Sequence, residues 1–359
     1  MKLLITNWIK RYFSDPQVVF LGGFLVVLLA VLLLAGRMMA PVVAAVIIAY
    51  LLEGLIGLLQ RRSVPRLFAV LVIYLGFLLV VILILFGLLP LISKQSAQLI
   101  QQIPVMLAEG QAVLQRLPEL YPEVISAAQV SEIMAAIRTE LTTWGQQALS
   151  ITVASILGLI TVLIYLVLLP LLVFFMLKDK SLIIGWLQHF LPRNRQLAGK
   201  VWSEVDRQIG NYIRGKFLEV IIVWVVSYMV FLGFDLQYAM LLSMVVGLSV
   251  LVPFIGAAVV TVPVVVVALF QFGWSSDLAW LVAAYLVIQI LDGNLLAPVL
   301  LSEVTDLHPV AIITAVLFFG GLWGLVGIFF AIPLATVVQA VVHAWPRPRD
   351  LEPSSGDLI

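Results

Sequence analysis

Long uninterrupted apolar runs occupy most of this chain and decide the solvent in which it can fold. Residues 18–36 and 67–92 are two of these runs, and about 20 apolar residues are enough to cross the hydrocarbon core of a bilayer. Apolar residues make up 63% of the sequence and charged residues 11%, whereas a soluble domain has about 25% charged residues. No water-soluble fold buries this much hydrocarbon, so the sequence predicts an all-α polytopic membrane protein.

Length and helical periodicity divide the chain into spanning and interfacial segments. Six segments are long enough to span the bilayer with some tilt, namely 18–36, 38–59, 67–92, 149–177, 217–234 and 278–299. Segments 93–148 and 178–216 carry apolar residues at helical spacing and are predicted to be amphipathic helices outside the bilayer. These helices either pack on the membrane domain or a neighbouring subunit, or lie flat in the headgroup region.

The basic residues between the spans give an orientation, because cytoplasmic loops carry an excess of Lys and Arg. Segment 178–216 has eight basic and three acidic residues, whereas 93–148 has three basic and five acidic residues. The predicted order is N-terminal transmembrane helices at 1–92, a periplasmic helical segment at 93–148, a transmembrane helix at 149–177, a cytoplasmic helical segment at 178–216, a transmembrane core at 217–344 and a disordered tail at 345–359. Both termini are predicted to be cytoplasmic.

Two apolar stretches, 238–272 and 309–343, do not fit single spans, and each is interrupted in its middle. The spans before and after the first stretch must meet the same face, so the stretch has to return to the side from which it starts. Its break is Pro253-Phe254-Ile255-Gly256, and the second break is Gly320-Gly321-Leu322-Trp323-Gly324. We predict two re-entrant helical hairpins, the first opening outward and the second inward. Each stretch alternatively forms one kinked helix or two spanning helices joined by a tight turn.

Polar residues lie between the two hairpins, in the inner half of span 278–299. They are Gln289, Asp292 and Asn294, and Pro298 follows them. A charged carboxylate in hydrocarbon costs at least about 2.5 kcal/mol, so Asp292 is expected to face a cavity or a partner. The three polar side chains are candidates to bind a polar solute or a monovalent cation, and Asp292 is a candidate to exchange a proton. Alternatively, they cap a broken helix at the cytoplasmic interface.

Two further titratable residues lie near predicted membrane segments. His308 precedes Pro309 at the start of the second hairpin and is a candidate proton relay, because imidazole changes its charge near physiological pH. It alternatively caps the helix that follows. Glu53 lies inside span 38–59, either as a functional charge or as a solvated carboxylate near the interface.

The residues of the two breaks are candidates for a solute path and its gate. Pro253, Phe254 and Gly256 are predicted to line the path, because irregular backbone at membrane depth occurs only beside protein or a water-filled cavity. The candidate gate consists of small or helix-breaking residues: Pro298, Gly320, Gly321, Gly324, Gly327 and Pro333. The glycines alternatively serve only close packing of the hairpin arms.

Sequence signatures of enzymes, metals and cofactors are missing. The chain has no Gly-x-x-x-x-Gly-Lys loop, no His-Glu-x-x-His motif, no Gly-x-Ser-x-Gly elbow and no cysteine. We predict neither an enzyme nor a bound cofactor or metal. The net charge of +1 gives no long-range attraction for nucleic acid. The expected partners are membrane lipids and a transported small polar solute, monovalent cation or proton.

Short motifs follow one another along nearly the whole chain. The first part carries Pro41, Ala49-Tyr50-Leu51-Leu52, Phe175-Met176-Leu177-Lys178-Asp179 and Ile213-Arg214-Gly215. The second part carries Pro253-Phe254-Ile255-Gly256, Pro263, Gln289, Asn294, Pro298, Leu307-His308-Pro309, Gly320-Gly321, Gly324, Gly327 and Ile332-Pro333. Each motif alone is weak, but in this order and spacing the chain resembles the autoinducer-2 exporter family of PerM-like bacterial permeases.

The resemblance implies a multi-pass transporter of the bacterial inner membrane. Some family members resemble exporters of the signal autoinducer-2 and others resemble Na⁺(Li⁺)/H⁺ antiporters, so both functions stay open, with a membrane scaffold or regulator as a third alternative. The resemblance also implies a homo-oligomer, with a pentamer as the expected size, and elevator-like movement of the hairpin region. Two positions depart from the family pattern: Asp292 stands where glutamate is common, and Gly54 replaces the usual proline after the second span.

Overall fold

The computed structural model describes residues 16–120, 131–132, 135, 139, 155–189, 196–253, 255–301 and 307–344. These residues form helices and no strand, which confirms the predicted all-α fold. Five helical runs among them are long and apolar enough to cross a membrane, namely Pro41–Arg61, Arg66–Gly110, Asp206–Gly233, Ile255–Phe272 and Ser276–Leu301. Together with shorter apolar helices they make this a polytopic membrane protein. The predicted tail 345–359, most of 121–148 and Phe254 lie outside the described residues.

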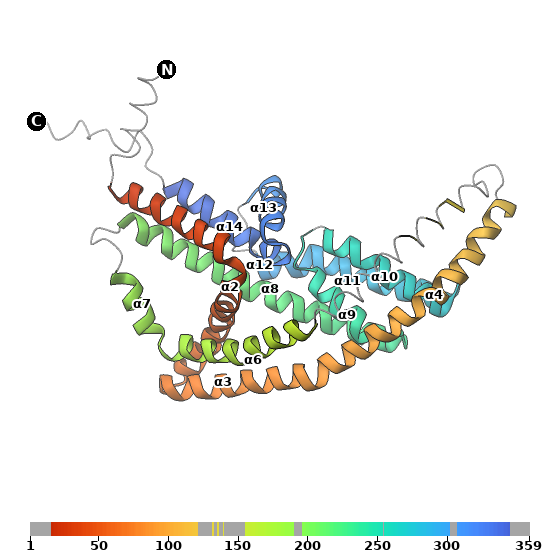
Figure 1. The fold of residues 1–359 in the computed structure, drawn as a ribbon, viewed down its shortest axis with the longest axis horizontal. Coiled ribbons are helices and arrows are strands. Elements are labelled where there is room, and N and C mark those ends of the chain that lie inside the picture. Colours follow the sequence, from red (N-terminus) through yellow and green to blue (C-terminus); the bar gives the residue numbers. More distant parts are fainter. Residues whose placement is uncertain are drawn as a thin grey trace, which may run out of the picture.

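Helix α2 (Pro16–Arg61) is one continuous helix of 46 residues, where the sequence predicts two separate spans, 18–36 and 38–59. Figure 1 shows that α2 bends along its length, and Pro41 is the proline inside it. A proline inside a helix removes one backbone hydrogen bond and kinks the helix without necessarily ending it. The apolar run therefore changes direction instead of forming a loop. The helix also passes through Gly54 without a turn.

The third predicted span continues directly into the predicted periplasmic segment. Helices α3 (Arg66–Leu83) and α4 (Leu89–Leu120) are joined by a π turn, η1 (Ile84–Leu88), in which the N–H of Leu89 donates to the carbonyl of Ile84. Figure 1 shows this run curving along one side of the molecule and on past its other helices. The predicted boundary between 92 and 93 thus falls inside α4, because an apolar stretch and an amphipathic stretch share one helix.

Helix α6 (Ser155–Lys178) packs against α2 and α3 through a buried apolar cluster. Its buried members are Ala45, Ala49, Ile56, Ala69, Val70, Val173 and Leu177. At the end of this cluster, Arg66 donates to both carboxylate oxygens of Glu53 at 2.9 and 3.3 Å, and Lys180 donates to the same carboxylate at 3.1 Å. Lys180 opens α7 (Lys180–His189). Glu53 is therefore a partly exposed carboxylate paired with two cations, and these ion pairs tie three helices together.

Helix α8 (Gln196–Gly233) is the central element of the C-terminal half. It has 38 residues, about 57 Å at a rise of 1.5 Å per residue. It packs against α2 and against the later helices α9, α11, α12 and α14, as Figure 1 shows. The predicted boundary between the cytoplasmic segment 178–216 and span 217–234 lies inside this helix. A helix can pass from water into a membrane without a loop, since its backbone hydrogen bonds are satisfied internally.

Helices α9 (Ala239–Ser249) and α10 (Ile255–Phe272) form a hairpin whose turn, described for residues 250–253, lies at the first predicted break. A Cβ atom on Gly256 would overlap the carbonyl oxygen of Ser249, so the close return of the chain requires glycine there. The two helices contact each other and share a buried apolar cluster with α8 and α11. This reversal excludes the alternative of one kinked helix.

Helices α13 (Pro309–Trp323) and α14 (Leu325–Ala344) form the second hairpin. Its turn is Gly324, the last residue of the predicted break. The backbone angles of Gly324 are φ 62° and ψ −137°, which residues other than glycine rarely adopt. A Cβ atom on Gly327 would overlap the carbonyl oxygen of Phe319, and one on Gly320 would lie 2.9 Å from Ile328. The two arms therefore pack closely through glycine, which agrees with the packing alternative for these residues.

Candidate functional site

The predicted polar residues of span 278–299 lie at a π turn that interrupts a long helix. Helix α11 (Ser276–Leu291), the π turn η2 (Asp292–Leu296) and α12 (Ala297–Leu301) follow one another without a loop. The backbone N–H of Ala297 donates to the carbonyl oxygen of Asp292, five residues earlier. Single π turns within helices are frequent at functional sites. This one carries Asp292 and Asn294.

Helix α8, which contacts η2 and α12, carries a buried ion pair. The Nζ atom of Lys216 lies 2.9 Å from an Oε atom of Glu219, and only 5% of Lys216 and 1% of Glu219 are exposed. Lys and Glu are almost never fully buried unless they are paired. The predicted segments separated these residues by ending one segment at Lys216 and starting a span at 217. A glutamate inside that apolar span, three residues after a lysine, is the signal from which the pair could have been found.

Asp292 and this ion pair together form what we call the charge cluster (Lys216, Glu219 and Asp292). Asp292 lies within electrostatic range of both partners. Its Oδ1 atom is buried and has no hydrogen-bond partner among the described residues. Two carboxylates and one ammonium carry a net charge of −1 when all three are ionised. The cluster is therefore balanced only when it holds one further positive charge.

Two members of the charge cluster lie inside a helical run that is long and apolar enough to cross a membrane. Glu219 is 13 residues from the start of Asp206–Gly233 and 14 from its end, and Lys216 lies three residues before it. Ionisable groups in the middle of a membrane helix are rare, and they usually face the bundle interior or a water-filled cavity. Such groups mark the routes of ions and solutes, which makes the charge cluster the leading candidate site.

Further polar groups continue along α8 from Glu219. Ser227 is fully buried, and neither its Oγ atom nor the Nε1 atom of Trp224 has a hydrogen-bond partner within the described part of the chain. Lys216 and Ser227 are 11 residues apart, about three helical turns, and so lie on the same face of α8 as Glu219. Buried polar atoms are therefore found on α8 between the charge cluster and the loop that joins α8 to α9.

The other polar candidates near η2 have local partners. The hydroxyl of Tyr285 contacts Gln289 and lies 3.1 Å from Thr261 Oγ1 on α10. The side-chain amide of Asn294 donates to the carbonyl oxygen of Ile290 at 2.9 Å. Asn294 and Pro298 are exposed on the surface of the chain. The predicted alternative, a polar group that stabilises an interrupted helix, describes Asn294, whereas Asp292 faces charged partners.

His308 is the N-cap residue of α13. Its Nδ1 atom accepts a hydrogen bond of 3.3 Å from the N–H of Val310, and Pro309 occupies the first helical position. This geometry matches the predicted alternative to a proton relay. At the first hairpin, the carbonyl of Pro253 accepts from Ile255 N–H at 2.7 Å within the turn. The structure thus gives His308, Pro253 and Gly256 local structural contacts.

A hydrogen bond joins α8 to the second hairpin at the position where Pro333 interrupts the backbone hydrogen bonding of α14. Proline has no N–H, so the carbonyl of Phe329, four residues earlier in α14, loses its partner within the helix. The hydroxyl of Tyr212 on α8 donates to this oxygen at 3.2 Å. Tyr212 is buried one turn before Lys216. The helix that carries the charge cluster is therefore linked directly to the point where α14 lacks a backbone bond.

Helical hairpins beside ionisable groups within membrane helices are the arrangement from which secondary transporters build their sites. The fold and the site thus define a class, that of polytopic membrane transporters.

Known proteins of similar sequence narrow this class to a family. A family model described as AI-2E family transporter matches residues 23–347. The chain is 45% identical over 343 residues to "Putative permease PerM" of Escherichia coli (strain K12), covering 96% of this chain and 97% of that protein. It is 24% identical over 332 residues to "AI-2 transport protein TqsA" of the same strain, covering 91% and 92%. "Putative transport protein YrrI" of Bacillus subtilis (strain 168) is 26% identical over 321 residues, covering 86% and 87%. The chain belongs to the AI-2E transporter family, as its motifs predicted.

Proposed function

We propose that this protein is a secondary transporter of the bacterial inner membrane whose charge cluster takes up a proton or a monovalent cation during the transport cycle. The observation that carries the proposal is the burial of the Lys216–Glu219 pair in an apolar helix beside Asp292, whose buried Oδ1 atom lacks a partner among the described residues. Unbalanced charge is costly where the dielectric constant is low. A bound proton or cation removes that cost, and its release leaves the cluster ready for another cycle.

The first solute that we propose is autoinducer-2, moved out of the cell. Support comes from the description of the family and from the similarity to the relative named AI-2 transport protein TqsA. Transport rather than catalysis is also supported by the permease and transport names of the relatives.

The second candidate function is exchange of Na⁺ or Li⁺ for H⁺. The net charge of the charge cluster favours it, because either ion balances the same two carboxylates and the ions must therefore compete. If the protein is such an antiporter, the cation is itself the transported solute, and Asp292 is indispensable.

A flux assay in proteoliposomes tests both functions. Autoinducer-2 and Na⁺ are compared under an imposed pH gradient with the wild-type protein, Asp292→Asn and the control Asp277→Asn, whose carboxylate is exposed at the start of α11. Flux of the transported solute is expected to fall at least tenfold in Asp292→Asn and to be unchanged in Asp277→Asn. Export of autoinducer-2 that survives Asp292→Asn would refute a coupling role for the cluster. Absence of any flux with folded wild-type protein would favour a scaffold.

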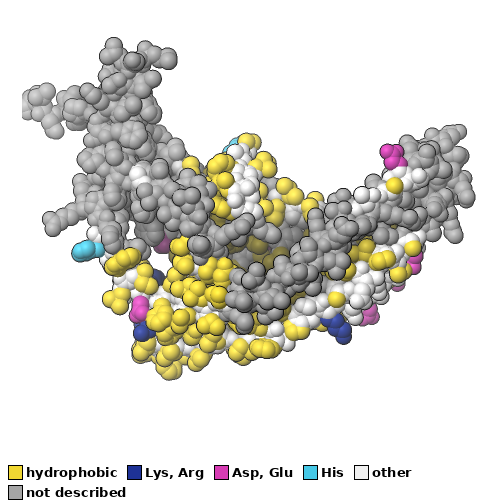
Figure 2. Space-filling model, viewed as in Figure 1, with side chains coloured by type: hydrophobic (Ala, Val, Ile, Leu, Met, Phe, Trp, Pro, Cys, Tyr) yellow, Lys and Arg dark blue, Asp and Glu magenta, His cyan; other side chains and the backbone are white. Residues whose placement is uncertain are grey.

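We also propose the arrangement in the membrane. The two hairpins enter from opposite faces without crossing, both termini lie in the cytoplasm, and the chain forms a homo-oligomer, with a pentamer as the expected size. Exposed apolar side chains support burial of α3 against lipid or another subunit: Leu67, Phe68 and Leu75 are each about 60% exposed. Figure 2 shows hydrophobic side chains covering this region. Native mass spectrometry from detergent micelles measures the number of subunits, and a monomer under all conditions would contradict this part of the proposal.

A further inference from the structure

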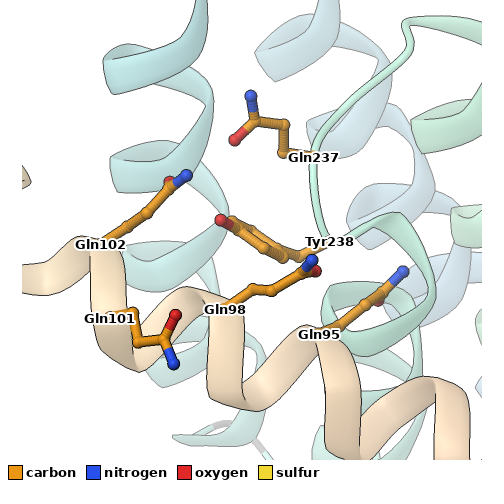
Figure 3. Close-up of a pocket in the computed structure, with 6 residues that line it drawn as sticks. All are labelled: Gln95, Gln98, Gln101, Gln102, Gln237 and Tyr238. Carbon is orange, nitrogen blue, oxygen red and sulfur yellow. The ribbon is translucent and has the colours of Figure 1, made fainter.

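A polar pocket lies far from the charge cluster, where α4 crosses the loop between α8 and α9. It has a volume of about 340 Å³ and is lined by Gln95, Gln98, Gln101, Gln102, Gln237 and Tyr238. The first four come from α4, and the last two from the residues that lead into α9. Figure 3 shows the side chains of Gln102, Gln237 and Tyr238 around a common space, with Gln98 beside the Tyr238 ring.

The lining is polar but carries no charge. Each glutamine amide supplies two donor hydrogens and an acceptor oxygen, and the tyrosine hydroxyl supplies one donor and one acceptor. Such groups match hydroxyl and carbonyl groups, which also donate and accept. A charged solute would find no counter-ion among the six side chains. The chemistry therefore favours a small neutral solute with several hydroxyl groups, and a volume of about 340 Å³ lies at the lower end of the usual range for such sites.

Hydrogen bonds hold the two sides of the pocket in place. The Gln95 oxygen accepts from Leu241 N–H at 2.8 Å and so fixes α4 against the first turn of α9. On the other side, the N–H of Gln237 donates to the side chain of Gln271 at 2.7 Å, and that side chain donates to the carbonyl of Asp235 at 2.8 Å. These contacts position the lining residues and, among the described residues, use the side chain of Gln95 but not the side-chain amide of Gln237.

The backbone of the loop is strained at the pocket. Asp235 and Tyr238 have φ angles of 51° and 59°, in the left-handed region that residues other than glycine seldom occupy. Strain of this kind costs about 1–3 kcal/mol per residue and is concentrated at binding and active sites. Here it sets the direction of Tyr238, whose ring is buried while its hydroxyl reaches the pocket.

We propose that this pocket is a binding site for a small neutral polyhydroxylated solute at the end of α8 opposite the cytoplasmic segment. The inference rests on the proposed transport function, and it names the substrate class. The loop begins where α8 ends, at Gly233, 14 residues from Glu219, which is about 20 Å along the helix. The buried polar groups Trp224 and Ser227 lie between the two sites.

Direct binding tests the pocket without any flux. The full-length protein in lipid nanodiscs is titrated calorimetrically with D-ribose as a neutral polyhydroxylated probe and with ribose 5-phosphate as its charged counterpart. Ribose is expected to bind and the phosphate to bind at least tenfold more weakly. In Gln98→Leu/Gln102→Leu, which changes two exposed side chains, the Kd for ribose should rise at least tenfold. Gln60→Leu, at the exposed end of α2, is the matched control and should leave the Kd unchanged.

Tyr238→Phe provides a second variant that keeps the ring and removes only the hydroxyl, and it should raise the Kd several-fold. Equal binding of ribose by wild type and both pocket variants, no ribose binding at all, or preference for the phosphate would overturn the assignment. Failure of the pocket is distinguishable from failure of the transport function. Binding is measured here without a gradient, whereas the charge cluster is tested by gradient-driven flux in Asp292→Asn.

Discussion

At the residue scale, the energetic cost of each charge in the charge cluster depends on the other two charges. Removing one partner of a buried ion pair leaves an unbalanced charge in a low-dielectric site, which typically destabilises a protein by about 3–5 kcal/mol. Replacing both partners with apolar residues of similar volume is often close to neutral. For the Lys216–Glu219 pair, we therefore expect different changes in the free energy of unfolding for single and double variants.

Lys216→Met is expected to lower the free energy of unfolding by about 3–5 kcal/mol, and Lys216→Met/Glu219→Leu to recover most of that loss. Unfolding of the detergent-solubilised variants, followed by circular dichroism, measures both. Lys180→Met is the matched control, because Lys180 makes an ion pair with Glu53 that is largely exposed and should cost at most about 1 kcal/mol. A double variant as unstable as the single one would show that Asp292 needs Lys216 even without Glu219.

The hydrogen bond from Tyr212 to Phe329 has a measurable dependence on Pro333. Tyr212→Phe removes the donor and should cost about 1 kcal/mol of unfolding free energy. In a Pro333→Ala background, the alanine N–H restores the partner of the Phe329 carbonyl within α14, so Tyr212→Phe should cost much less. A double-mutant cycle on thermal unfolding isolates this coupling. Additive effects of the two substitutions would mean that Tyr212 contributes through packing alone.

At the element scale, the glycines of the second hairpin divide into those that permit close packing and those that do not. A Cβ atom on Gly327 would overlap the Phe319 carbonyl, whereas one on Gly321 would meet nothing within 4 Å. Gly327→Ala should therefore destabilise the hairpin by about 1–3 kcal/mol, as overpacking does. Gly321→Ala, inside α13, should stabilise it by about 0.5–1 kcal/mol. Thermal unfolding of both variants distinguishes them, and equal effects would argue against a tight contact between α13 and α14.

The tips of the two hairpins should be reached from opposite sides of the membrane. The chain contains no cysteine, so Ile255→Cys and Trp323→Cys each provide a single site. An impermeant maleimide is expected to label Ile255→Cys from outside and Trp323→Cys from inside, because the tip of a hairpin that does not cross the membrane is reached through the side from which the hairpin enters. Leu182→Cys, on the exposed face of α7, is the control for the cytoplasmic side. Labelling of each tip only from the opposite face would show that the helices span the membrane.

The hairpin turns were predictable from sequence and the continuous helices were not, for one physical reason. Pro253 restricts the local backbone, and Gly256 and Gly324 allow close approach or a positive φ, so each turn lies at or next to residues that mark it. At the joins within α2, α4 and α8 the hydrophobicity changes while the backbone continues as a helix, and α2 passes Pro41 with a change of direction only. For the same reason, the predicted boundary after residue 216 placed Lys216 and Glu219 in different segments. Asp292 was recognised because it stands alone in an apolar run, but its partners on α8 depend on tertiary packing.

At the scale of the whole molecule, two of the buried apolar clusters define two packing units. Helices α2, α3 and α6 share one buried cluster, and α8 to α11 share another. The units meet where α2 crosses α8: the hydroxyl of Tyr50 lies 2.9 Å from both the carbonyl and a carboxylate oxygen of Asp206, and the guanidinium of Arg214 lies 6.0 Å from the Tyr50 ring centroid. Beside these polar contacts, Ile47 and Leu51 of α2 pack on an apolar cluster that contains Tyr212 and Ile213 of α8. This is the boundary at which movement of one unit against the other can be tested.

A cross-link across this boundary tests whether transport requires such movement. A Cβ atom on Gly210 would lie 2.6 Å from the Tyr50 ring, so Tyr50→Cys/Gly210→Cys replaces the ring with a thiol and places a second thiol nearby. A short bifunctional methanethiosulfonate should bridge the pair and stop flux of the transported solute in proteoliposomes. Reduction of the bridge should restore the flux. The two single-cysteine variants, treated in the same way, should keep their flux. Full flux in the bridged protein would mean that α2 and α8 stay together throughout the cycle, and the moving boundary would then have to lie between α8 and the hairpins.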